Sequence, residues 1–136
     1  MKIELWALLG CVLILFLSIL FQGTYLDLTS GIKYALSSRA EAPPNQGPMG
    51  ARLDRNVRNQ VEGLALFAPL VLIAGVAEIS TGLTQTAAII VVVARALYVP
   101  AYTFDWSPFR TLFWMGSFFG SGAFAFGILS AAGLPF

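Results

Sequence analysis

The sequence predicts an all-α membrane protein, a four-transmembrane-helix bundle. Of its 136 residues, 57% are hydrophobic and only 11% are charged, whereas soluble domains carry roughly 25% charged residues. The charges are also uneven, because residues 5–26 and 111–136 contain none. A spanning helix needs about 20 mostly apolar residues, so each of these stretches is long enough to cross a bilayer alone. Two further apolar runs, residues 63–77 and 79–94, are separated only by Glu78.

Four helices are expected from these runs. The first is predicted to be a retained helix and not a cleaved secretion signal, because its apolar core is too long and no small-residue cleavage site follows it. The inner two runs are long enough if each helix continues past its flanking charges. We therefore expect a single domain over residues 1–136, with helices at about 3–26, 53–79, 84–102 and 109–133.

The connectors differ in length and chemistry. Residues 42–50 hold three prolines and two glycines, and we expect this stretch to be non-helical, because proline lacks a backbone donor and glycine favours turns. Pro69 is expected to kink the second helix. Residues 80–82 form a predicted tight turn, and the aromatic connector at 104–108 suits the level of the lipid headgroups.

Basic residues predict the orientation of the bundle. Of the eight lysines and arginines, only Lys2 lies on the side of the two termini; the other seven lie in or beside the first and third connectors. By the positive-inside rule, both of these charged connectors are expected to be cytoplasmic. Both termini are then expected on the opposite side of the membrane.

Composition also argues against several classes of function. With a net charge of +1, the chain has no basic stripe to neutralise phosphates, so we expect no nucleic-acid partner. It has no histidine, which argues against histidine acid–base chemistry, haem ligation and the usual zinc sites, and we expect no metal. Cys11 is the only cysteine and is expected to be a small buried or lipid-facing residue.

Polar side chains on one face of the second helix form the first half of a candidate site. Arg55, Asn59 and Glu62 stand at i, i+4 and i+7, and Arg58 borders their face. A lone carboxylate two turns into a membrane helix costs on the order of a few kcal/mol. We therefore expect Glu62 to face the interior of the bundle and to have a cationic or amide partner.

The third helix offers a complementary face. Arg95, Tyr98 and Tyr102 stand at i, i+3 and i+7, and Arg110 opens the fourth helix on the same side. Any single arginine is explained by an ion pair or by an anchor at the headgroups. The whole set favours a small ligand with carboxylates and an amine, because arginine binds carboxylates bidentately and Glu62 can accept from an amine.

Small residues recur along the fourth helix, beginning with Gly116 and Gly120. Such spacing lets helices approach closely. Packing within the bundle and a contact between subunits are equally good explanations of it.

These motifs resemble the signature of the MAPEG family, the membrane-associated proteins in eicosanoid and glutathione metabolism. Arg55, Asn59 and Glu62 form the spacing Arg-x-x-x-Asn-x-x-Glu at the start of a second membrane helix. The spacing Arg-x-x-Tyr-x-x-x-Tyr that begins at Arg95, and the arginine at 110, extend the similarity. Length, four spans and the long first connector also agree, so the resemblance covers essentially the whole chain, which looks like a bacterial-type member.

The resemblance implies a homotrimer in the lipid bilayer that binds glutathione between adjacent subunits. The implied function is that of a glutathione-dependent transferase or peroxidase acting on lipophilic electrophiles, with glutathione as thiol co-substrate. By the same resemblance, Arg110 is the implied catalytic residue, which stabilises the glutathione thiolate. The implied glutathione-binding residues are Arg55, Asn59, Glu62, Arg95, Tyr98 and Tyr102.

Three positions depart from the family's pattern. Val57 stands where many members have glutamine or histidine, and Ala65 stands where a proline commonly follows the glutamate. Arg110 lies one residue further from Tyr102 than in the leukotriene-forming members. The residues alone leave a second function open, a non-catalytic membrane protein whose polar face binds lipid headgroups or a partner. A transporter is disfavoured, because no pair of broken helices is expected at the midplane.

Overall fold

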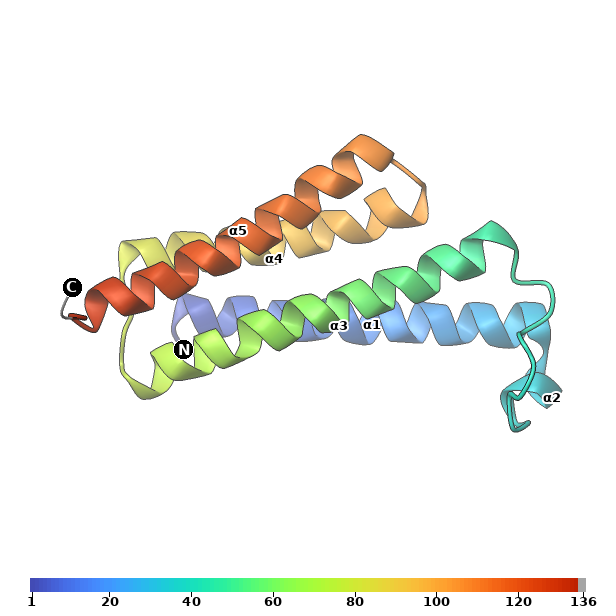
Figure 1. Ribbon diagram of the computed structural model, residues 1–136. Helices are drawn as coiled ribbons and strands as arrows, with labels where there is room; N and C mark the ends of the chain where they lie inside the picture. Colours follow the sequence, from blue (N-terminus) through green and yellow to red (C-terminus); the bar gives the residue numbers. More distant parts are fainter. Residues whose placement is uncertain (135–136) are drawn as a thin grey trace.

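The computed structural model describes residues 1–134, which form an antiparallel bundle (Figure 1). Four of its helices are long and apolar enough to cross a membrane, which confirms the predicted all-α membrane fold. A fifth, very short helix lies in the first connector. The helices are α1 (Ile3–Ser30), α2 (Ile32–Ala35), α3 (Gly47–Val76), α4 (Gly82–Thr103) and α5 (Ser107–Ala131). Residues 135–136 of the expected domain lie outside the described part of the chain.

The bundle has two distinct ends. The N-terminus, the α3–α4 turn and the end of α5 lie together at what we call the terminal end (Figure 1). The long first connector with α2, and the α4–α5 turn, lie at the opposite, connector end. Helix α4 packs most extensively against α5 and also contacts α1 and α3. Helix α4 is therefore the element that joins the two halves of the bundle.

The helix bounds differ from the expected ones mainly around the first connector. The prediction that residues 42–50 are non-helical is wrong for its last part, because α3 already begins at Gly47. Pro48 lies in the first turn of α3, where a missing backbone donor leaves no helical hydrogen bond unmade. Helix α1 continues to Ser30 and ends at Gly31, whose φ of 85° favours glycine.

Hydrogen bonds fold the long connector back onto α1. The Gln46 side chain donates to the hydroxyls of Thr29 and Ser30 at 2.6 and 2.7 Å. The Tyr25 hydroxyl in turn donates to the carbonyl of Gln46 at 2.8 Å. These bonds tie the residue that precedes α3 to the last two turns of α1. They therefore fix where α3 begins.

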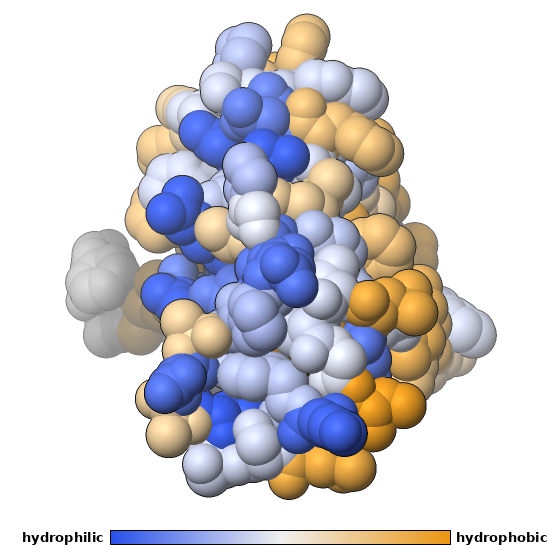
Figure 2. Space-filling model, turned by 90° about the vertical axis from the view of Figure 1, so that its right-hand side faces the viewer, coloured by the Kyte–Doolittle hydropathy of each residue, from blue (hydrophilic) through white to orange (hydrophobic). Residues whose placement is uncertain are grey.

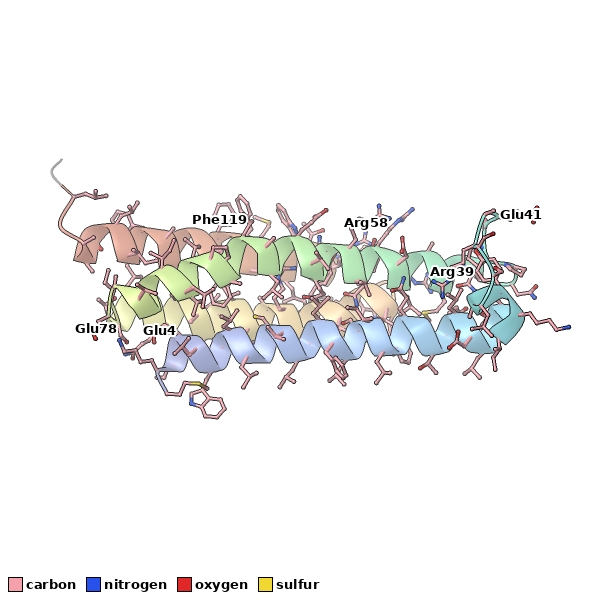
Figure 3. All side chains as sticks on the ribbon, turned by 90° about the horizontal axis from the view of Figure 1, so that it is seen from below. Glu4, Arg39, Glu41, Arg58, Glu78 and Phe119 are labelled. Atoms are coloured by element: carbon pink, nitrogen blue, oxygen red, sulfur yellow. The ribbon has the colours of Figure 1, made fainter. Side chains whose placement is uncertain are left out.

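The core is a compact apolar cluster in the half of the bundle nearer the terminal end, built from the first part of α1 and α4 and the last part of α3 and α5. Phe67 of α3 and Phe124 of α5 meet edge to face, with ring centroids 5.5 Å apart, and Val91 of α4 is equally buried. Cys11 is buried at the edge of the same cluster. Large hydrophobic side chains such as Phe119 point outward instead (Figure 3), which is the arrangement expected where the surrounding solvent is lipid.

The small residues of α5 are used for packing within the chain. A Cβ added at Gly120 would lie 2.9 Å from the Val91 side chain, and one added at Gly127 would lie 2.9 Å from that of Thr84. Both neighbours belong to α4. The close approach of α4 and α5 therefore explains these glycines without a second subunit.

A buried carboxylate joins three elements at the terminal end. Glu4 is only 3% exposed, and its Oε1 accepts from the hydroxyls of Thr84 at 2.7 Å and Ser80 at 2.9 Å. Thr84 is also the N3 residue of the capping box that begins α4. The first turn of α1 is thus fixed to the α3–α4 turn and to the start of α4.

Candidate functional site

Helix α3 carries its polar residues on two neighbouring faces. Asn56, Gln60 and Gly63 are buried and face the other helices, whereas Arg55 and Glu62 are exposed on the surface of the chain. The expectation that Glu62 faces the interior of the bundle is wrong for the single chain. The physical reason is helical geometry, because the buried stripe of α3 lies one position away from the face that Glu62 shares with Arg55.

Arg95 and Asn59 form the strongest polar link between α3 and α4. The Arg95 side chain is buried, and its Nη1 donates to the Asn59 side-chain oxygen at 2.7 Å and to the Asn59 carbonyl at 3.1 Å. A buried guanidinium needs such acceptors, since an unpaired charge in an apolar interior is costly. The structure therefore joins two of the predicted site residues directly to each other.

Two neighbours on α3 make this link possible. The Arg95 guanidinium lies directly over Gly63, where an added Cβ would clash with it. Gln60 donates from its side chain to the carbonyl of Arg95 at 3.3 Å. The buried side of α3 thus holds both the side chain and the backbone of Arg95, so this arginine has a fixed place in the bundle.

Tyr98, Tyr102 and Arg110 form a second group towards the connector end. The two tyrosine rings have centroids 5.4 Å apart, and the Arg110 guanidinium lies 5.0 Å above the Tyr102 ring. Arg110 also faces Asp105, at 3.6 Å between Nη1 and Oδ1, and its side chain remains 34% exposed. A cation above an aromatic face is held by the ring quadrupole, so Arg110 is positioned by α4 while it stays accessible.

The single chain does not gather all the predicted residues into one cleft. Arg95 and Asn59 form one group, and the two tyrosines with Arg110 form another. The side chains of Arg55 and Glu62 make no hydrogen bond or ion pair with any of the residues 1–134. Arg58 pairs instead with Asp54, at 3.0 Å, and points away from the bundle (Figure 3).

The polar groups nevertheless share one end of the molecule. Figure 2 looks onto the connector end, where hydrophilic residues run across the face from top to bottom and hydrophobic ones gather along its right-hand edge. An amphiphilic surface of this kind suits the boundary between headgroups and hydrocarbon. Within residues 1–134, no three acidic, cysteine or histidine side chains come together as a metal site would require.

Sequence reasoning missed the buried polar residues of α3. Asn56, Gln60 and Gly63 stand at i, i+4 and i+7, one position along from the predicted face of Arg55 and Glu62. The signal was present, because two amides in a membrane helix must either face the bundle interior or remain unsatisfied in lipid. The amide and glycine pattern therefore marks the inward face of α3, and the charged residues mark the face beside it.

Comparison with known proteins agrees with this arrangement. The family model of MAPEG matches residues 3–130 of the chain. No curated protein and no solved structure matches the chain significantly. The family match takes in all four membrane-spanning helices, with the Arg95–Asn59 link and the tyrosines beside Arg110. The chain therefore belongs to the MAPEG family.

Proposed function

We propose that this protein is a glutathione-dependent transferase or peroxidase that acts on lipophilic electrophiles within the membrane. Membership of the MAPEG family is consistent with that class of activity. The observation that carries the proposal is the placement of Arg110, held over the Tyr102 ring yet 34% exposed. A guanidinium in that position is available to a thiolate and is restrained in orientation.

The chemistry asked of Arg110 is electrostatic. A free thiol has a pKa of about 8.5, and a neighbouring cation lowers it, which raises the fraction of thiolate at neutral pH. The thiolate is the nucleophile in both versions of the reaction, attack on an electrophilic carbon or on a peroxide oxygen. The lipophilic acceptor would reach it from the bilayer, along the apolar surface of the helices.

The side chains proposed to bind glutathione are mainly those that are exposed in the single chain. Arg55 is suited to a glutathione carboxylate and Glu62 to its amine. Asn59 presents its amide nitrogen beside them, since its oxygen is taken by Arg95. Arg95 enters the site through Asn59, which it holds in place, and Tyr98 and Tyr102 supply phenol groups on the adjacent face of α4.

The exposed position of Arg55 and Glu62 supports a homotrimer with glutathione bound between subunits. Charged side chains in a membrane helix are unfavourable when they face lipid. A second copy placed against this face of α3 would cover them and complete the ring of polar groups. We also retain the proposal that the charged connectors are cytoplasmic and that the termini lie on the other side, following the positive-inside rule.

Glutathione binding is the direct test of the proposed function. Detergent-purified protein is titrated calorimetrically with glutathione and with an S-alkyl analogue. Arg55→Ala and Glu62→Gln are each expected to weaken binding about tenfold or more, in line with the loss of a charged hydrogen bond. Because both side chains are exposed in the chain, neither change should lower its thermal stability much.

Arg39→Ala provides the matched control, because Arg39 is an exposed arginine of the first connector outside the proposed site. It should bind glutathione like the parent protein. Mass measurement in mild detergent should give a trimer. A monomer that binds glutathione with full affinity would contradict the shared site. Absence of glutathione binding, with phospholipid headgroups retained on the same face, would favour the non-catalytic membrane protein instead.

A further inference from the structure

The end of α1 and the short helix α2 expose apolar side chains. Leu28, Ile32 and Leu36 are 82%, 68% and 83% exposed, more than Leu17 in the membrane-spanning part of α1, at 60%. Ile32 and Leu36 stand one turn apart, because the Leu36 N–H donates to the Ile32 carbonyl at 2.9 Å, and so they lie on the same face. Apolar side chains that gather on a surface mark a contact with a partner or a membrane.

The polar side chains of the same segment are used within the connector. The Ser30 hydroxyl donates to the carbonyl of Pro44, and the Tyr34 hydroxyl donates to that of Glu41, both at 2.6 Å. A connector folded in water would bury apolar side chains and leave polar ones in solvent. Here the polar groups bond to the connector itself and the apolar groups face outward, which is the arrangement of a segment that lies on a bilayer.

The length of α1 places these residues at the edge of the hydrocarbon. Residues 5–26 carry no charge, and Asp27 is the first charged residue after them. A helix rises 1.5 Å per residue, so this stretch spans about 33 Å, close to the roughly 30 Å of a hydrocarbon core. Leu28 therefore lies at the boundary with the headgroups. Helix α2 lies beside the end of α1 and not further along its axis (Figure 1), so Ile32 and Leu36 are near the same level.

The lipid-facing surface of α1 continues into this segment. Leu17 and Leu28 are separated by about three full helical turns, so they lie on one face of α1. The contact between subunits proposed above uses a different surface, the charged face of α3. Lys33, which stands between Ile32 and Leu36, is exposed, and a lysine at such a boundary lays its stem on apolar surface and its ammonium among phosphates. Continuity and charge both favour phospholipid as the partner.

We infer that the end of α1 and helix α2 form an anchor in the phospholipid leaflet at the connector end. Leu28, Ile32 and Leu36 insert among the upper parts of the acyl chains. Lys33 reaches the headgroup phosphates. Because Gln46 ties the start of α3 to the same end of α1, the anchor also fixes the depth at which α3 begins. The inference does not depend on glutathione binding and can be tested without it.

Spin labels on the full-length protein in phospholipid nanodiscs measure the surroundings of each position. Cys11 is replaced by alanine, and a single cysteine is introduced by Ile32→Cys or Leu36→Cys and labelled with a nitroxide. Molecular oxygen concentrates in hydrocarbon and a nickel chelate stays in water, so paramagnetic relaxation by the two reagents distinguishes lipid from water. Both labels should be more accessible to oxygen than to nickel, as should a label at Leu17→Cys.

Ser38→Cys is the matched control, because Ser38 is an exposed polar residue of the same connector. Its label should be more accessible to nickel than to oxygen. If the labels at Ile32→Cys and Leu36→Cys had the same nickel accessibility as this control, the apolar residues would lie in water. If neither reagent reached them, a second copy of the chain would cover them. Either result would overturn the inference.

A charge substitution tests whether the apolar side chains hold the segment in the leaflet. Ile32→Asp places a carboxylate at the apolar boundary, where charge is unfavourable, and the label at Leu36→Cys should shift toward nickel accessibility. Ser38→Asp adds the same charge at the control position and should leave that label in hydrocarbon. Because Ile32 is exposed, thermal unfolding should stay unchanged. A label that remained in hydrocarbon in the Ile32→Asp protein would contradict the anchor.

Discussion

The two ends of the bundle differ in how closely their helices pack. At the terminal end, Glu4 joins α1 to the α3–α4 turn, and Gly127 lets α5 lie directly against Thr84. At the connector end, α4 and α5 rise away from α1 (Figure 1), a cavity opens between α1 and α4, and charged side chains remain exposed. At the terminal end, polar contacts join α1 to α4 directly, whereas at the connector end the hydrogen bonds tie the first connector to α1. The exposed charged side chains of the proposed site belong to this second, more open region.

The Arg95–Asn59 link lies between the terminal end and the connector end of the bundle. Arg95 is as buried as the residues of the core, but it belongs to the helical stretch from which the tyrosines reach toward the connector end. Arg95 therefore fixes the position of α3 relative to α4 on the side of the core that leads to the connector end. We expect the loss in stability to decrease in the order Glu4, the Arg95–Asn59 link and Arg110 when each is removed in turn.

The largest effect is expected from loss of the carboxylate at the terminal end. Glu4→Ala removes the charged acceptor of the hydrogen bonds from the Thr84 and Ser80 hydroxyls, which should destabilise the bundle by about 3 kcal/mol. Thermal unfolding followed by circular dichroism in detergent measures the shift. Glu78→Ala is the control, because Glu78 lies at the same end (Figure 3) but is exposed. If both variants lowered the unfolding temperature equally, the hydrogen bonds of Glu4 would make no particular contribution to stability.

A smaller effect is expected at the link itself. Gly63→Ala places a methyl group where the Arg95 guanidinium lies, and overpacking of this kind costs about 1–3 kcal/mol, offset in part by alanine's higher helix propensity. Glutathione affinity should fall as well, because Arg95 can no longer hold Asn59. Gly122→Ala in α5 has open space around the added Cβ and should stabilise slightly without changing affinity. A Gly63→Ala protein that bound glutathione normally would detach Arg95 from the proposed site.

The contrast between the ends also explains what the sequence could predict. Uncharged runs of membrane length led directly to the four spans, because a bilayer leaves few alternatives to helix. Proline and glycine composition misplaced the start of α3, since Pro48 in a first helical turn carries no penalty. Composition identifies the breaker residues but not whether they begin a helix or interrupt one.

For the candidate site, the sequence could place residues on helix faces but could not give the geometry of the site. Spacing alone placed Arg95, Tyr98 and Tyr102 on one face, and the rings of the two tyrosines do lie next to each other, with centroids 5.4 Å apart. Spacing could not decide whether the face of Glu62 or the face of Gln60 points inward, because both carry polar residues and they are one position apart. Only the packing of α3 against α4 resolves that choice.

The smallest effect on stability, and the one most specific to chemistry, is expected from Arg110→Ala. Its ion pair with Asp105 spans 3.6 Å with both side chains partly exposed, and exposed pairs contribute roughly 0–1 kcal/mol. The protein should therefore unfold within about 1 kcal/mol of the parent, and glutathione affinity should change only a few fold. The pKa of the bound thiol should rise, and turnover at neutral pH should fall, because the cation that favours the thiolate is gone.

The ultraviolet absorbance of the bound thiolate against pH measures that pKa without knowledge of the natural acceptor. Arg110→Lys is the informative companion, since it keeps the charge but loses the planar guanidinium that lies on Tyr102. If charge alone activates the thiol, lysine should restore most of the pKa shift. If the fixed position over Tyr102 matters, lysine should restore little. A parent protein whose bound thiol titrates like free glutathione would remove Arg110 from the chemistry and leave it as an anchor of the α4–α5 turn.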